Sequence, residues 1–254
     1  MKIGILRRLV FFAFLIVCWA TISKLNIWDA TLFPSPLQVG QTLWHMLADG
    51  SLLIAIHVSL QRVLLGYAIS LIIGVPLGIL LAQAKWAQET IGSLVLGLQT
   101  LPSICWLPLA LLWFGLNDKA ILFVVVTGAL LAVTVAVEDG VRNVPPVYLR
   151  AARTLGTRRL SLYTEVLLPA SLPAIMTGAK LGWSFAWRAL MSGELLVAGL
   201  GLGQQLQSGR DLADMSRVIA IMIVIVALGL LVDRTIFVEL ERRVRERWGL
   251  LQSS

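Results

Sequence analysis

The stretch that decides the fold is RAARTLGTRRLSLYTEVLLP, residues 150–169. The preceding Asn143-Val144-Pro145-Pro146 predicts a helix start, because proline is tolerated in the first turn of a helix. The residues from Val147 to Leu155 then predict a short helix, and Gly156 is placed to end it. The first half of the stretch is therefore expected to be a helix that closes at a glycine hinge.

The second half of the stretch predicts another helix. Thr157 is suited to cap it, the helix is expected to run from Arg158 to Leu168, and Pro169 is expected to end it. An exposed elbow of two helices is typical of a docking element. An arginine-rich loop retained by its charge is the simpler interpretation, but it leaves the ordered prolines and glycine unexplained. The cationic residues of this elbow are Arg153, Arg158 and Arg159.

The composition around this stretch is that of a membrane protein. Of 254 residues, 58% are hydrophobic and 14% are charged, with a mean hydropathy of +0.85. Ordinary globular domains have about 45–50% apolar and about 25% charged residues, so most soluble classes are excluded. Cys18 and Cys105 lie inside apolar runs and give neither a disulfide framework nor metal-ligand spacing. We expect an all-α polytopic membrane protein with no metal site.

Six apolar stretches are candidates to cross the bilayer, because about 20 apolar residues span its hydrocarbon core. The first follows Lys2, Arg7 and Arg8, as a signal peptide does, but no Ala-x-Ala-like cleavage site follows it, so we expect it to be retained. The six stretches are Leu9–Ser23, Val63–Gln83, Ile91–Phe114, Ala120–Val137, Ala174–Val197 and Val218–Phe237.

The distribution of cations predicts the orientation. With the N-terminus inside, 14 Lys and Arg residues fall on the cytoplasmic side, five fall outside, Arg62 among them, and two lie within the fifth stretch. Cations near span ends are retained in the cytoplasm, so both termini are expected inside. The formal charge of +7 is then a property of membrane loops, and no nucleic-acid partner is expected.

The stretch around Gly156 resembles a family motif. The inner-membrane permeases of binding-protein-dependent ATP-binding cassette (ABC) importers carry Glu-Ala-Ala, three residues, Gly, nine residues and Ile-x-Leu-Pro in a cytoplasmic loop. Here Ala151, Ala152 and Gly156 have that spacing, and Val166-Leu167-Leu168-Pro169 follows after nine residues. Val166 replaces the isoleucine conservatively. Arg150 replaces the glutamate, so the role of that acid is not carried over to this chain.

Further matches cover residues 32–240 and resemble the nitrate, sulfonate, taurine and bicarbonate branch of these permeases. They are Leu32-Phe33-Pro34-Ser35-Pro36, Leu101-Pro102-Ser103 with Trp106-Leu107-Pro108-Leu109 and Leu112-Trp113-Phe114-Gly115, and Trp187-Arg188-Ala189-Leu190 with Gly193-Glu194. The resemblance implies a type I (MetI-like) importer permease core in a bacterial inner membrane. The substrate within the branch stays open.

The resemblance also implies partners. Two permease copies, here expected to be identical, would form the path, two ATPase subunits would sit beneath them, and an extracytoplasmic binding protein would deliver a small anion. The chain has no Gly-x-x-x-x-Gly-Lys-Ser/Thr loop, so we expect no ATPase activity from it, and ATP and magnesium are expected to be used by the partner. The coupling residues that the motif implies are Ala151, Ala152, Arg153, Gly156, Thr157, Arg158, Leu168 and Pro169.

The fifth stretch carries polar residues that need an explanation, because a charge at mid-membrane costs about 2.5–3.5 kcal/mol on insertion scales. Lys180, Trp187 and Glu194 recur every seven residues and share a helix stripe to within about 20°. Arg188 is offset from that stripe by about 100°. One hypothesis puts Trp187 and Arg188 at a dimer interface that attracts an anion. The other pairs Arg188 with Glu194 or a nearby carbonyl, and Lys180 is expected to extend to the cytoplasm.

The third stretch is expected to be broken at Pro102 and Pro108, and a broken membrane helix is tolerated where it lines a wet cavity or is covered by protein. A kinked packing helix is the alternative. Gly74, Pro76 and Gly78 in the second stretch are expected to be close-packing positions. The expected path residues are Gln99, Thr100, Ser103, Trp106, Trp187, Arg188 and Glu194.

The remaining segments complete the expected organisation. Ser35 and Pro36 predict the start of an amphipathic helix on the outer face, and residues 239–248 predict a charged helix that continues the last span. We expect residues 1–58 to hold the first span and this outer helix, 59–240 the permease core with its loop at 139–173, and 241–254 a tail. An ion-gradient-driven transporter or channel is the alternative function, but no internal repeat is visible in the sequence. An intramembrane enzyme lacks a nucleophile with a base.

Overall fold

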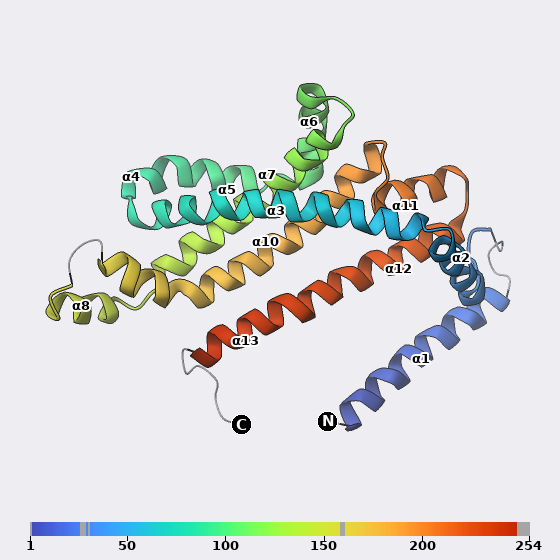
Figure 1. Cartoon of the computed structure of the whole chain (residues 1–254), viewed down its shortest axis with the longest axis horizontal. Coiled ribbons are helices and arrows are strands. Elements are labelled where there is room, and N and C mark those ends of the chain that lie inside the picture. Colours follow the sequence, from blue (N-terminus) through green and yellow to red (C-terminus); the bar gives the residue numbers. More distant parts are fainter. Residues whose placement is uncertain (1, 26–28, 30, 158–160, 248–254) are drawn as a thin grey trace. The chain divides into compact units, whose positions relative to one another are not determined.

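The computed structural model describes residues 2–25, 29, 31–157 and 161–247, and in these ranges the chain forms helices and no strand (Figure 1). It divides into two compact units: residues 1–59 with 198–227, and residues 60–197 with 228–254. Helices α3 (Ser51–Gln83) and α12 (Met215–Val232) begin in the first unit and continue into the second. Each unit is described by itself.

The first unit contains α1 (Lys2–Lys24), α2 (Pro36–Ala48) and α11 (Leu202–Asp211). The start of α2 confirms the sequence prediction, because Ser35 caps the helix and forms a reciprocal capping box with Gln38. Val39 and Met46 are buried on one face of α2, whereas Leu37 and Trp44 are exposed. That exposed apolar side suits a helix at a membrane surface.

The second unit is built around α7 (Asp118–Arg142) and α10 (Leu168–Leu196), which lie side by side along most of their lengths (Figure 1). Their contact surface buries Val124, Ala186 and Leu190 completely. Helix α3 packs closely against α7, since a Cβ atom at Gly78 would lie 2.6 Å from the backbone oxygen of Thr134. The close-packing role predicted for Gly78 is therefore confirmed.

Shorter elements complete the second unit. One group of them follows α3 in the sequence, a second group lies between α7 and α10, and the third group continues α12. They are α4 (Lys85–Ala87), η1 (Gln88–Gly92), α5 (Ser93–Gln99), η2 (Ser103–Trp106), α6 (Leu107–Phe114), α8 (Pro146–Thr154), η3 (Leu162–Leu167), η4 (Asp233–Phe237) and α13 (Val238–Arg247). In α13 Glu239 forms ion pairs with Arg242 and Arg243, as the alternating charges of the tail predict.

Helices occupy all six stretches predicted to cross the membrane. Among the described residues, three helices are long and apolar enough to do so: Ser51–Gln83, Asp118–Arg142 and Met215–Val244. The segments 85–99 and 103–114 add a fourth span if the bent pair is counted as one, and Leu9–Lys24 is a shorter apolar helix. Helix α10 has the length of a span but carries charged residues. Six spans with both termini inside stays a prediction.

Two expected boundaries are wrong. Pro169 does not end a helix, because it lies in the first turn of α10, directly after the π-helical segment η3. Proline is accommodated in a first turn, where its missing N–H leaves no hydrogen bond broken. Helix α3 begins at Ser51 instead of Val63. Arg62 therefore lies inside this helix and not in an outer loop, and its charge is neutralised there by carboxylates from two other helices.

Candidate translocation site and coupling elbow

One side of α10 is exposed and carries several polar residues. Thr177, Ser184 and Arg188 are exposed along it, the apolar Leu181 is exposed between Thr177 and Ser184, and Ser192 is half-buried one turn beyond Arg188. Each hydroxyl donates to a carbonyl four residues earlier, at Pro173, Lys180 and Arg188 respectively. Such bonds satisfy a hydroxyl without any partner from another helix. A polar face of this kind in a membrane helix normally faces protein or water instead of lipid.

Arg188 is the charged group of this face. Its Nε donates to the backbone oxygen of Ser184 at 3.1 Å, and its guanidinium carbon lies 4.6 Å from the centre of the Phe185 ring. Among the described residues Arg188 has no carboxylate partner. The expected pairing with Glu194 is wrong, whereas the expected contact with a nearby carbonyl is confirmed. The two terminal nitrogens of Arg188 remain available as hydrogen-bond donors.

A break in the helices faces Arg188. The segments 85–99 and 103–114 are bent by 103°, and the turn between them contains Thr100, Leu101 and Pro102. The hydroxyl of Thr100 donates to the oxygen of Gly97 at 2.7 Å. The break predicted at Pro102 is confirmed, but Pro108 lies in the first turn of α6 and breaks nothing.

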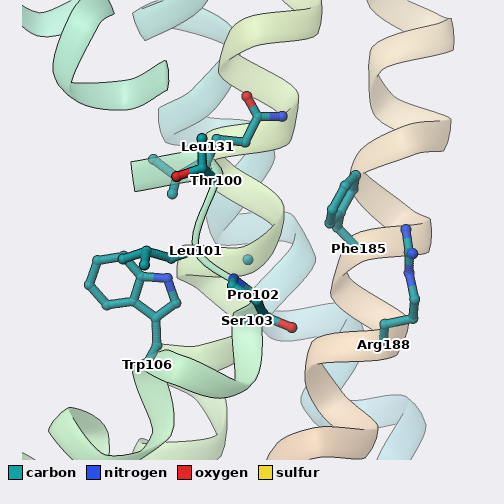
Figure 2. Close-up of a pocket in the computed structure, with 10 residues that line it drawn as sticks. Thr100, Leu101, Pro102, Ser103, Trp106, Leu131, Phe185 and Arg188 are labelled. Carbon is teal, nitrogen blue, oxygen red and sulfur yellow. The ribbon is translucent and has the colours of Figure 1, made fainter. Parts of the chain in front are cut away.

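The break and α10 enclose a cavity of about 260 Å³ in the second unit. Figure 2 shows the Ser103 hydroxyl pointing toward α10, which carries Phe185 and Arg188, while Trp106 lies on the other side of Pro102. Of the seven expected path residues, Gln99, Thr100, Ser103, Trp106 and Arg188 line this cavity. Leu101 and Pro102, within the predicted wall from Gln99 to Trp106, line it as well, whereas no sequence pattern indicated Gly128, Leu131 and Phe185 as lining residues.

Trp187 and Glu194 do not reach the cavity. The Trp187 ring stacks on that of Trp183 at 6.1 Å, within the hydrophobic core of the second unit. Glu194 is completely buried and binds Arg62. Trp187 and Arg188 are adjacent in sequence, so they point about 100° apart, and only Arg188 faces the cavity.

The partners of the buried and half-buried charges were also missed. Arg62 contacts Glu194 and Asp118, and Lys180 forms an ion pair with Asp233 at 3.1 Å instead of extending to the cytoplasm alone. The only sequence signal was the charge itself, since an ionisable residue in an apolar helix normally has a partner. The spacing of charged residues along the sequence does not identify which carboxylate pairs with Arg62 or with Lys180.

The first half of the elbow, the helix that ends at Gly156, is formed as predicted, and residues 158–160 of the second half lie outside the described residues. Gly156 has a φ of +85°, which side chains other than glycine rarely adopt. The N–H of Thr157 donates to Ala152 and that of Gly156 donates to Arg153, each at 3.1 Å. These two bonds are the Schellman pattern that satisfies the last carbonyls of a helix. The predicted helix end at this glycine is confirmed.

The elbow carries a second cavity, of about 460 Å³. Ala151, Arg153 and Leu168 are exposed, and Ala152 is buried. Pro169 is half-buried and Arg158 lies outside the described residues. The cavity is lined by Tyr148, Ala151, Ala152, Leu155, Glu165, Val166, Ala170 and Pro173. Apart from Glu165 and the tyrosine hydroxyl, these side chains are apolar.

Long apolar helices, a polar helix face and a broken helix are typical of a polytopic membrane protein that moves solutes. Residues 74–246 match the family model described as "Binding-protein-dependent transport system inner membrane component", which is more than half of the chain. The chain belongs to this family. It is a membrane permease subunit of ABC importers, and its family works with an ATPase and a substrate-binding protein.

Three relatives illustrate the similarity. A putative ABC transporter permease of Methanocaldococcus jannaschii is 32% identical over 227 residues, covering 87% of this chain and 85% of the relative. The putative aliphatic sulfonates transport permease SsuC of Bacillus subtilis is 28% identical, with coverage of 97% and 89%. The nitrate import permease NrtB of Leptolyngbya laminosa is 33% identical, with coverage of 78% and 74%.

A solved structure shares the fold. A chain of the inward-facing MetNI methionine ABC transporter superposes with a TM-score of 0.68, and the match covers 76% of this chain and 96% of that one. The sequence identity is 22%, so this likeness shows the fold alone. The all-α, type I importer permease fold that the elbow motif predicts is confirmed.

Proposed function

We propose that this chain forms the path through which an ABC importer moves a small oxyanion, of the nitrate, bicarbonate, taurine or alkanesulfonate type. The observation that carries the proposal is Arg188, an exposed arginine of α10 without a carboxylate partner among the described residues, which lines a cavity opposite a broken helix. A guanidinium presents paired donors that match an oxyanion in two-pronged geometry.

The surroundings of Arg188 support this chemistry. Phe185 covers one face of the guanidinium, which holds the cation near the cavity without neutralising it. Ser103 and Gln99 line the same cavity and can donate hydrogen bonds to an oxyanion. Several weak donors around one cation allow an anion to enter and to leave again, as conduction requires. Trp187 and Glu194 would act on this site only through packing.

The names of the relatives support the substrate class. One relative is named for aliphatic sulfonates and another for nitrate. Both substrates present several equivalent oxygens and a single negative charge, which is the feature that an arginine recognises. The branch resemblance in the sequence adds taurine and bicarbonate to this class.

We also propose that the permease acts as a homodimer. The polar face of α10 is exposed in the single chain, and a polar face inside a bilayer is normally covered by protein or water. A second copy that faces it would enclose the path. Two ATPase subunits would dock at the elbow of Ala151, Ala152, Arg153, Gly156, Thr157, Arg158, Leu168 and Pro169, and would use ATP and magnesium.

The same elbow gives a route for coupling. The second side of the elbow leads through η3 directly into α10, which carries Arg188. Movement of a docked ATPase would therefore be transmitted along one helix to the anion site. Alternating access then follows when the ATP-bound and ATP-free states favour different arrangements of α10.

Competitive uptake tests the proposal. The complex, purified with its ATPase and binding protein, is placed in proteoliposomes, and ATP-driven uptake of radiolabelled taurine, butanesulfonate, nitrate and bicarbonate is measured. We expect one of these oxyanions to be transported, and Arg188→Gln to lower its uptake at least tenfold. Arg210→Gln, which removes an exposed cation of α11, is the matched control. Equal losses in both variants, or transport only of solutes without an oxyanion group, would contradict the proposal.

A further inference from the structure

Arg62 joins three helices of the second unit through two carboxylates. Its Nη1 donates to Glu194 Oε1 at 2.8 Å and its Nη2 donates to Asp118 Oδ1 at 2.6 Å. Arg62 comes from α3, Asp118 is the first residue of α7, and Glu194 lies near the end of α10. These three residues form the Arg62 network.

The two halves of the Arg62 network differ in burial. The Glu194 side chain is 0% exposed, that of Arg62 is 10% exposed and that of Asp118 is 72% exposed. A buried carboxylate without a cation is strongly unfavourable, whereas an ion pair to an exposed carboxylate contributes little. The bond to Glu194 is therefore the part of the network on which the structure depends.

Helices α3 and α10 pack closely against α7 near the Arg62 network, which restricts the movement of its side chains. A Cβ atom at Gly193 would lie 3.2 Å from the Ile121 side chain, and one at Gly66 would lie 2.6 Å from that of Val125. These contacts bring α10 and α3 tightly against α7 next to the charges. Arg62 thus holds Glu194 at one defined position.

Glu194 and Arg188 belong to the same rigid element. They are six residues apart, which corresponds to about 9 Å along the axis of α10 and about 120° around it. Any rotation of the outer part of α10 that displaces Glu194 also turns Arg188 away from the cavity. The inner part of the helix is tied separately, by the ion pair of Lys180 with Asp233.

We propose that Arg62 is a positioning residue of the transport site: its bond to Glu194 sets the rotation of α10 and thereby aims Arg188 at the cavity beside the broken helix. Asp118 is a dispensable second acceptor. This inference rests on the proposed role of Arg188 in binding the anion. The competing view is that the Arg62 network only stabilises the fold.

Three substitutions separate these views. Arg62→Lys keeps the charge, but one ammonium group does not reproduce the fork that reaches two carboxylates. Glu194→Gln keeps the shape and removes the buried charge, and Asp118→Asn removes the exposed one. In the reconstituted complex we expect Arg62→Lys and Glu194→Gln to raise the KM for the transported anion at least fivefold, with a smaller change in kcat per assembled complex. Asp118→Asn should change KM less than twofold.

Two further measurements do not depend on transport. In a background with Cys18 and Cys105 replaced by serine, Ser184→Cys reports the exposure of the α10 face to a charged thiol reagent. We expect Arg62→Lys to change the labelling rate at this position at least threefold. Since Glu194→Gln can fail to fold, the charge exchange Arg62→Glu with Glu194→Arg, made in the Asp118→Asn background, is the second test. It should restore the labelling rate and at least half of the loss in KM.

The outcomes are distinct. Reduced amounts of complex with unchanged KM and unchanged labelling in the assembled fraction would overturn the proposal and leave only a stabilising role. Equal effects of Asp118→Asn and Glu194→Gln would also overturn it. Unchanged KM in Arg188→Gln would instead refute the proposed anion site, and the labelling rates would still decide whether Arg62 sets the rotation of α10.

Discussion

The guanidinium carbon of Arg188 lies 4.6 Å from the centre of the Phe185 ring, and both residues line the same cavity. A cation over an aromatic face is stabilised by about 0.5–2 kcal/mol. The ring leaves the edge of the guanidinium, where its remaining N–H groups point, accessible to an anion. This arrangement keeps a cation in a membrane protein without the carboxylate that would neutralise it.

Removal of this ring is the first prediction. Phe185→Leu keeps an apolar side chain but loses the aromatic face, so Arg188 is held less firmly at the cavity. We expect the KM for the anion to rise about 2- to 30-fold, which corresponds to the loss of about 0.5–2 kcal/mol of cation–π energy. Phe185→Tyr retains the face and should stay within twofold of the parent. Uptake kinetics in proteoliposomes provide the measurement, and equal KM values in both variants would argue against the contact.

The glycine of the elbow gives the second prediction. Gly156 has a φ of +85° and no atom within 4 Å of an added Cβ, so Gly156→Asp introduces backbone strain of about 1–2 kcal/mol without a clash. We expect the protein to remain in the membrane but to lose most of its bound ATPase, as measured by co-purification. Gly50→Asp is the matched control, since Gly50 has a φ of +78° and equally open surroundings. ATPase recovery that is unchanged in Gly156→Asp would exclude the elbow as the docking site.

Close packing of α3 and α7 gives the third prediction. Gly78→Ala would place a methyl group 2.6 Å from the Thr134 backbone oxygen, and overpacking of this kind costs about 1–3 kcal/mol. We expect a lower melting temperature of the purified permease and less protein in the membrane. Gly40→Ala, in α2 with nothing within 4 Å, should be neutral or slightly stabilising. A Gly78→Ala protein as stable as the parent would show that α3 and α7 are not packed this tightly.

The ion pair between α10 and the last helix gives the fourth prediction. Lys180 and Asp233 are 35% and 36% exposed and lie 3.1 Å apart. Either Lys180→Gln or Asp233→Asn leaves an unpaired charge in a membrane-spanning region, so each alone should destabilise more than both together. Thermal unfolding of the single and double variants measures this coupling. The exposed pair of Lys85 and Glu89, treated in the same way, should show coupling of at most about 0.5 kcal/mol. Strictly additive effects at Lys180 and Asp233 would contradict the prediction.

The structural features that the sequence predicts correctly are those that depend on a few neighbouring residues. The cap at Ser35, the hinge at Gly156 and the break at Pro102 each depend on the backbone preferences of a few residues, and the structure has all three. The elbow motif combines such local signals with fixed spacing. That combination is why residues 150–169 predict the family and, through the family, the fold.

Relations between distant residues were not predictable in this way. Trp187 and Glu194 share a stripe with Lys180, but the stripe faces other helices of the unit instead of the cavity. Periodicity shows which residues share a face, and tertiary packing decides what that face meets. The sequence predicts Arg62 in an outer loop because Gln61 and Arg62 interrupt the apolar run, but helix α3 continues through both residues, from Ser51 to Gln83, and the Arg62 charge is paired there.

Membership of this chain in an ATP-driven oxyanion importer is tested most directly by the proteins that purify with it and by the solutes that the recovered complex transports. The tagged chain is purified gently from native membranes, its companions are identified by mass spectrometry, and uptake of radiolabelled taurine, butanesulfonate, nitrate and bicarbonate by the recovered complex is followed in proteoliposomes with and without ATP. We predict one ATPase subunit per permease chain and uptake of one of these anions that requires ATP. Recovery of the chain alone, transporting with only an ion gradient, would contradict the account.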